Sequence, residues 1–110
     1  MIRVTVYQDA SGRNSGFRME GHAQFAQYGK DIVCAAVSML VIKTMNSIEH
    51  FTEETFLQNV HREKDVVSFE ITSRPIGHDA ELLLNSMVMG LEAVAREYGK
   101  KYIRLKIERE

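Results

Sequence analysis

The apolar residues of this chain recur with two different periods, and the order of those periods constrains the fold more than any other feature. From Ile2 to Tyr7, apolar and polar residues alternate, which is typical of a strand with one buried face. The turn-forming stretch DASGRNSG at 9–16 is followed by a second alternating stretch at 17–22. We expect these two strands to form a hairpin.

Residues 32–50 change to a helical period. Apolar residues recur there at spacings of three and four, in a stripe made of Val33, Val37, Leu40, Val41, Thr44 and Ile48. Asp31 precedes the stripe, where its carboxylate would accept hydrogen bonds from the first-turn N–H groups as an N-cap. No charged residue lies between Ile32 and Ile42, so we expect this half of the helix to be covered on most sides.

The second half of the chain repeats the pattern of hairpin followed by helix. Residues 55–63 and 66–72 alternate as strands, with a turn at Lys64 and Asp65. A helix is predicted from about Asp79 to Tyr98, with inward residues Leu83, Leu84, Met87, Leu91, Val94 and Tyr98.

Gly99 is well placed to end that helix, and a last strand follows with Ile103, Leu105 and Ile107 on one face. The order is ββαββαβ. It predicts an α+β fold in two layers, with two helices packed on a mainly antiparallel sheet. At 110 residues, we expect residues 1–110 to form a single domain.

The composition excludes several classes of protein. A formal charge of −1 lacks the basic surface expected of a nucleic-acid-binding domain, so no direct nucleic-acid partner is expected. No apolar run approaches the roughly 20 residues of a membrane span, and the start lacks the apolar core of a signal peptide. A single cysteine cannot form an internal disulfide, and a lone thiol fits a reducing cytoplasm.

That cysteine, Cys34, is the residue on which function depends. With Asp31 as N-cap it lies in the first helical turn, where the helix dipole favours a thiolate and free N–H groups would receive an oxyanion. His22 precedes it by twelve positions, and Gly21 and Gly29 would let the intervening loop turn tightly at both ends. A nucleophile and its general base are therefore one interpretation.

Residue types and spacing leave other interpretations open. Cysteine is among the most buried residue types, so Cys34 also fits a packed core position. A metal site with His22 and Asp31 matches no zinc-ligand spacing, and a thiol redox site is a further alternative.

The stretch Gly21-His22-Ala23, then Gly29, then DIVCAAVS at 31–38 resembles the ribosomal-processing cysteine protease family, Prp. The length and element order also fit that family, so the likeness spans essentially the whole chain. The second half, from Thr52 onward, matches in architecture alone.

The resemblance implies a cytoplasmic endopeptidase without a cofactor, with Cys34 as nucleophile and His22 as base. Its partner would be a bacterial large-subunit ribosomal protein, from which it removes a short N-terminal extension after an aromatic residue. We also expect a homodimer, because a small two-layer sheet leaves a face or edge for one. The rival hypothesis is a non-catalytic ribosome-associated binding module with a structural cysteine.

Five further residues are candidates for binding the substrate or orienting the catalytic pair. Asp31 would cap the helix, orient His22, or do both. Ser38 lies one turn after Cys34, where its hydroxyl would face the site or bond to its own helix. Phe25 and Tyr28 would meet an aromatic substrate side chain or anchor the 23–30 loop, which would act as a lid that orders on substrate binding. Gly21 belongs to the motif itself.

Overall fold

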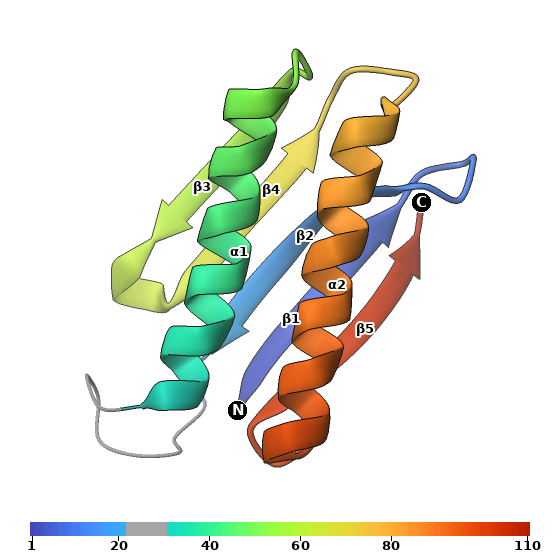
Figure 1. Cartoon of the computed structure of the whole chain (residues 1–110). Helices are drawn as coiled ribbons and strands as arrows, with labels where there is room; N and C mark the ends of the chain where they lie inside the picture. Colours follow the sequence, from blue (N-terminus) through green and yellow to red (C-terminus); the bar gives the residue numbers. More distant parts are fainter. Residues whose placement is uncertain (22–30) are drawn as a thin grey trace.

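Two helices lie on one face of a five-stranded sheet in the computed structural model, which describes residues 1–21 and 31–110 (Figure 1). The elements are β1 (Ile2–Gln8), β2 (Asn14–Gly21), α1 (Ile32–Phe51), β3 (Phe56–His61), β4 (Val66–Ile71), α2 (His78–Tyr98) and β5 (Ile103–Arg109). A short 3₁₀ helix, η1 (Arg62–Lys64), forms most of the turn between β3 and β4. The predicted α+β class and the ββαββαβ order are confirmed.

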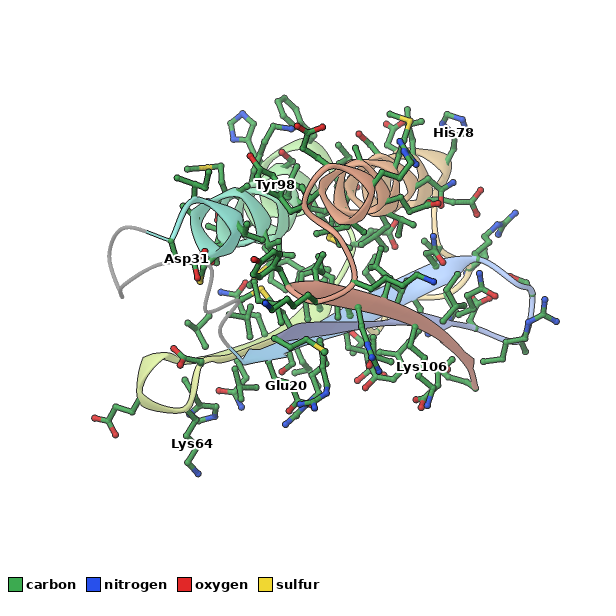
Figure 2. The ribbon with its side chains drawn as sticks, turned by 90° about the horizontal axis from the view of Figure 1, so that it is seen from below. Glu20, Asp31, Lys64, His78, Tyr98 and Lys106 are labelled. Atoms are coloured by element: carbon green, nitrogen blue, oxygen red, sulfur yellow. The ribbon has the colours of Figure 1, made fainter. Side chains whose placement is uncertain are left out.

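The strands lie in the order β3-β4-β2-β1-β5. Their pairings are antiparallel except for β1 and β5, which run parallel from Ile2 opposite Ile103 to Gln8 opposite Arg109. The predicted mainly antiparallel sheet is thus correct. Both helices cover the same face, and the other face is open, as the view along the sheet shows (Figure 2).

The core lies between the helices and the covered face of the sheet. Alternate residues of β1, namely Ile2, Val4 and Val6, are buried there, as the alternating pattern predicts. The β2 and β4 strands contribute Phe17 and Phe69, whose rings stack with centroids 5.7 Å apart. The helices contribute the stripes Val33, Val37, Val41, Met45 and Ile48, and Ala80, Leu84, Met87 and Leu91.

The predicted end of α2 is confirmed. Gly99 follows the helix with a φ of +95°, a conformation that favours glycine, and its N–H donates to the carbonyl of Ala95 at 2.8 Å. Leu83, Val94 and Tyr98 are partly buried against the core, so the inward face of α2 is the predicted one.

Three details differ from the sequence-based expectations. The second strand begins at Asn14 rather than near Phe17, so the turn is shorter than the stretch 9–16. The first half of α1 is not covered on most sides: Ile32 is 52% and Met39 66% exposed. The sheet and α2 cover two sides of the helix, and no layer formed by the described residues lies over the third. Ile107 is 55% exposed, because its half of β5 lies at the sheet edge.

The expectation about membrane spans is also corrected. The 20-residue helix α1 is long and apolar enough to cross a membrane by length and composition, with a mean hydropathy of 1.5. Its buried stripe packs on the sheet beside α2, an arrangement that accounts for the hydropathy of a core helix.

Candidate active site

Cys34 lies in the first turn of α1, in the position that the sequence predicts. Asp31 is the N-cap: its Oδ1 accepts a hydrogen bond from the N–H of Cys34 at 2.9 Å, while its carbonyl accepts from the N–H of Ala35 at 3.0 Å. Asp31 is 4% exposed, so this carboxylate is held inside the protein. The cap fixes the backbone that carries the thiol.

Cys34 is half-buried and touches the edge of the core. A fully packed structural cysteine would be covered, whereas this thiol keeps some solvent access. The N-terminus of a long helix carries partial positive charge, and the carboxylate of Asp31 at the N-cap offsets part of it. Solvent access and the remaining helix dipole favour the thiolate.

From the sequence we expect the first-turn N–H groups of α1 to bind an oxyanion, and the geometry shows that two of them have another acceptor. The N–H groups of Cys34 and Ala35 already donate to Asp31. An oxyanion formed next to Cys34 would therefore have to draw on other donors.

The end of β2 lies at the same end of the molecule as the start of α1, the turn that holds Cys34 (Figure 1). Its last residue, Gly21, has a φ of +92°, and its N–H donates to the carbonyl of Asp65 at 3.0 Å. A Cβ on this residue would lie 2.4 Å from the carbonyl oxygen of Met1. Only glycine fits both the backbone angle and this close approach, which agrees with the predicted tight turn.

The remaining predicted site residues divide into two groups. Ser38 is half-buried one turn beyond Cys34, as predicted. His22, Phe25 and Tyr28, and with them the expected lid at 23–30, lie outside the described residues.

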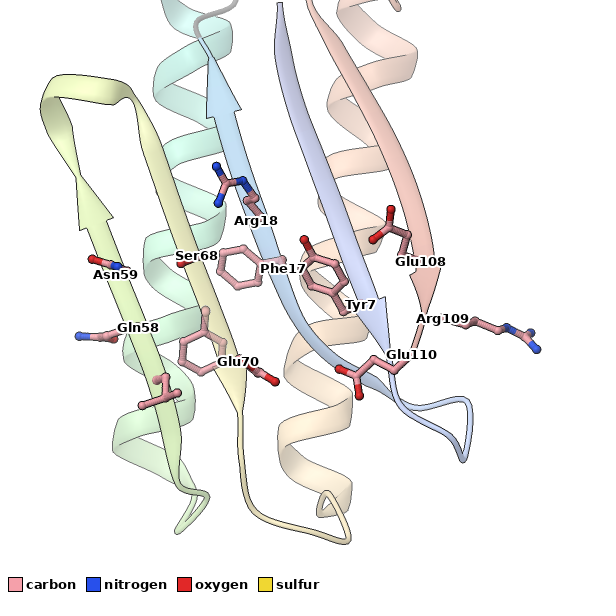
Figure 3. Close-up of a pocket in the computed structure, with 12 residues that line it drawn as sticks. Tyr7, Phe17, Arg18, Gln58, Asn59, Ser68, Glu70, Glu108, Arg109 and Glu110 are labelled. Atoms are coloured by element: carbon pink, nitrogen blue, oxygen red, sulfur yellow. The ribbon is translucent and has the colours of Figure 1, made fainter.

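A hollow of about 760 Å³ lies elsewhere, on the open face of the sheet (Figure 3). Tyr7, Arg18, Leu57, Glu70 and Glu108 are among the residues that line it. These residues lie on the face opposite the helices, so this hollow is separate from Cys34. Among residues 1–21 and 31–110, no group of three or more metal-ligating side chains is found.

Comparison with known proteins identifies the family of this chain. The family model described as Cysteine protease Prp matches residues 1–104. This chain belongs to that family. It is therefore a cysteine protease, and the resemblance inferred from the motif around Cys34 is confirmed.

Two relatives of this chain come from bacteria. The ribosomal processing cysteine protease Prp of Staphylococcus aureus is 32% identical over 106 residues, which cover 96% of this chain and 97% of the relative. The Prp of Bacillus subtilis is 29% identical over 101 residues, which cover 89% and 90% of the two chains.

Solved structures agree with the family assignment. A crystal structure of the S. aureus Prp with a covalently linked product peptide matches at a TM-score of 0.90 and 29% identity, over 98% of this chain and all of that one. The S. aureus Prp with a substrate peptide matches at 0.85 and 28% identity, with the same coverage.

Proposed function

We propose that this protein is a cytoplasmic endopeptidase that uses His22 and Cys34 to remove a short N-terminal extension from a bacterial large-subunit ribosomal protein. The proposal goes beyond family membership in three ways. It names the catalytic pair, the substrate and the place of action.

One observation supports the assignment of Cys34 as the nucleophile. The chain contains a single cysteine, and a cysteine protease needs a thiol to attack the peptide bond. The position of Cys34, half-buried in the first turn of a capped helix, supports that role.

The base is supported by the motif and by the path of the chain. His22 directly follows Gly21 in the sequence. The backbone of Gly21 is held at the end of the sheet where α1 starts. Histidine is the side chain best suited to exchange protons near neutral pH. Phe25, Tyr28 and Ser38 are proposed to contact the substrate.

The reaction then follows the usual course of a thiol nucleophile. The imidazole of His22 takes the proton of Cys34, and Sγ attacks the scissile carbonyl carbon. The C–N bond breaks as the leaving amine takes the proton from the imidazolium, and a thioester remains. Water, activated by His22, hydrolyses the thioester and releases the new carboxylate and the thiol. No cofactor takes part.

The substrate is proposed from the relatives. The S. aureus and B. subtilis proteins are named ribosomal processing proteases, and the S. aureus protein has been solved with a substrate peptide. We extend this to the N-terminal extension of one large-subunit protein, cut after an aromatic residue.

The test is cleavage of a peptide that carries this extension, followed by mass analysis of the products. Cys34→Ser should abolish cleavage while the melting temperature stays near that of the unmodified protein, because the change is small. His22→Ala should lower the rate by about 10²-fold or more. Lys43→Ala, an exposed residue of the same helix, is the matched control and should cleave normally.

A wrong nucleophile and the rival hypothesis would give different results. If Cys34→Ser cleaved the peptide as fast as the unmodified protein, the assignment of Cys34 as the nucleophile would be wrong. A protein that binds the peptide without cutting it would instead be the non-catalytic module, and its thiol would resist alkylation at neutral pH.

We also propose that the protein works as a homodimer. Exposed apolar side chains on the outer side of the helices, including Met39, Leu82 and Met89, offer surface that a second copy could bury. Light scattering coupled to gel filtration would give twice the mass of the 12.6 kDa chain. A mass of one chain at working concentration would contradict this part of the proposal.

A further inference from the structure

Three residues of α1 form a stripe that leads away from the thiol. Cys34, Ser38 and Ile42 follow each other at intervals of four, so they lie on neighbouring parts of one helix face. All three are half-buried, between the buried stripe of α1 and its exposed side. At 1.5 Å per residue, Ile42 lies about 12 Å along the axis from Cys34.

Ile42 lines a hollow between α1 and the end of β3. The hollow measures about 560 Å³ and is lined by Ile42, Val60, His61, Glu63 and Lys64. Val60 is 44% exposed although it pairs with Val67, which faces the core. An apolar side chain on the helix-facing side of a strand is thus left partly uncovered at this position.

The hollow lies toward the same end of the molecule as the thiol. The turn between β3 and β4 and the start of α1 share that end in Figure 1, and Lys64 and Asp31 lie on the same side of Figure 2. The hydrogen bond from Gly21 to Asp65 ties this turn to the end of β2. The path from Cys34 along α1 therefore reaches Ile42, which lines the hollow together with Val60 of β3.

The strand beside the hollow has a free edge. Within the described part of the sheet, β3 pairs with β4 alone, so its outer N–H and C=O groups meet no strand. An extended peptide can add to such an edge by main-chain hydrogen bonds, with alternate side chains entering pockets. Charged groups at the rim, on Glu63 and Lys64, keep the apolar part of the hollow confined to Ile42 and Val60.

We infer that the peptide substrate runs from Cys34 along Ser38 to this hollow, and that Ile42 and Val60 receive one of its apolar side chains. An extended peptide advances about 3.3 Å per residue, so the 12 Å path corresponds to about four residues. The hollow selects an apolar residue about four positions from the scissile bond. This inference rests on the proposed function, because it takes Cys34 as the attacking group.

The test compares Val60→Asp and Val60→Ala with a matched control on the same strand. Leu57 is 66% exposed and lies on the opposite face of β3, so Leu57→Asp adds the same charge away from the hollow. Peptides should extend at least six residues on each side of the scissile bond. We expect Val60→Asp to raise KM about tenfold and Val60→Ala about threefold, at nearly unchanged kcat, because the lost contact is made equally by bound substrate and transition state. Leu57→Asp should change KM less than twofold.

Shortened peptides show whether the effect arises in the hollow. If a peptide lacks the residue that the hollow holds, it should be cleaved with the same KM by the unmodified protein and by Val60→Asp. The inference is wrong if Val60→Asp leaves KM unchanged, or if it raises KM equally for the full peptide and for peptides shortened on either side. A melting curve of each variant identifies any that fail to fold.

A crosslinking experiment tests the position of the bound peptide without measuring KM. A photoreactive residue is placed at each peptide position in turn, and the peptide is incubated with Cys34→Ser protein. Labelling of β3 near Val60 from about the fourth position supports the inference, and labelling confined to other elements overturns it. If the unmodified protein cuts no peptide at all, the proposed function fails instead, and the two failures are therefore distinguishable.

Discussion

At the scale of single residues, the carboxylate of Asp31 has a role in the fold and a proposed role in catalysis. Its Oδ1 caps α1 through the N–H of Cys34 at 2.9 Å, so its structural role is established. A cap needs one acceptor oxygen, and Asn or Ser would supply it as well as Asp. The negative charge is therefore the part of Asp31 that the cap does not require.

The substitution Asp31→Asn separates the two roles. Because Asn caps as well as Asp, we expect the free energy of unfolding to change by less than about 0.5 kcal/mol. Cleavage should fall tenfold or more, about 1.4 kcal/mol of lost transition-state stabilisation, because the charge that orients His22 or contacts the substrate is gone. A melting curve and a rate constant on one purified variant measure both. Normal cleavage by Asp31→Asn would leave Asp31 with the cap alone.

At the scale of elements, β2 contains two glycines that are needed for different reasons. A Cβ on Gly16 would lie 2.3 Å from the carbonyl oxygen of Phe69, so this glycine lets β2 and β4 pack closely. Gly21 combines a close approach to Met1 with a left-handed backbone, and it directly precedes His22. Only Gly21 lies at the end of the molecule that carries Cys34.

These two glycines make a matched pair of variants. Gly16→Ala and Gly21→Ala should each lower the free energy of unfolding, by about 1–3 kcal/mol, because each places a Cβ against a backbone oxygen. Gly21→Ala should in addition lower kcat, because it shifts the segment that leads to His22. Assays at a temperature where both variants are folded, checked by circular dichroism, compare their kcat values. Equal kcat for the two variants would show that Gly21 serves the fold alone.

The elements themselves could be predicted from local pattern, but their surroundings could not. The period of the apolar residues is a property of each segment, and it located both helices and all five strands. The exposure of Met39 depends instead on whether another layer covers that side of α1, which no local pattern records. The same holds for the hollow at Ile42 and Val60, since its two sides are far apart in sequence.

At the scale of the whole molecule, the strand order β3-β4-β2-β1-β5 was not predicted beyond the two hairpins. The β2–β4 and β1–β5 pairings join segments separated by a helix or by most of the chain, and alternation does not select partners at that distance. The capped turn that holds Asp31 and Cys34 was predicted correctly, because both residues belong to one local segment. The position of His22 relative to Cys34 depends on a loop, so it stays a prediction.

The end of the molecule opposite Cys34 is held by a buried carboxylate. Asp9, in the turn between β1 and β2, accepts hydrogen bonds from the hydroxyl of Ser11 at 2.6 Å and from the N–H groups of Ser11 and Arg13. Arg74, in the segment before α2, pairs with it at 3.6 Å. The hydrogen bond from Ser11 contributes most to holding the pKa of Asp9 below its ordinary value of 3.8, and the other partners add to this against the opposing effect of burial.

A lowered pKa in the folded protein makes stability depend on pH with a definite sign. The unfolded chain binds this proton more readily, so the contribution of Asp9 is complete above about pH 5 and is lost as the pH falls through 3.8 and below. Asp9→Asn carries no titrating group, so the variant should be less stable than the unmodified protein at pH 7, and the difference should shrink toward pH 2. Urea unfolding of both proteins across this range measures the difference, with Asp79→Asn, an exposed carboxylate in the first turn of α2, as control. A difference that stays constant from pH 7 to pH 2 would mean that the charge of Asp9 does not stabilise the turn, and that the loss comes from packing alone.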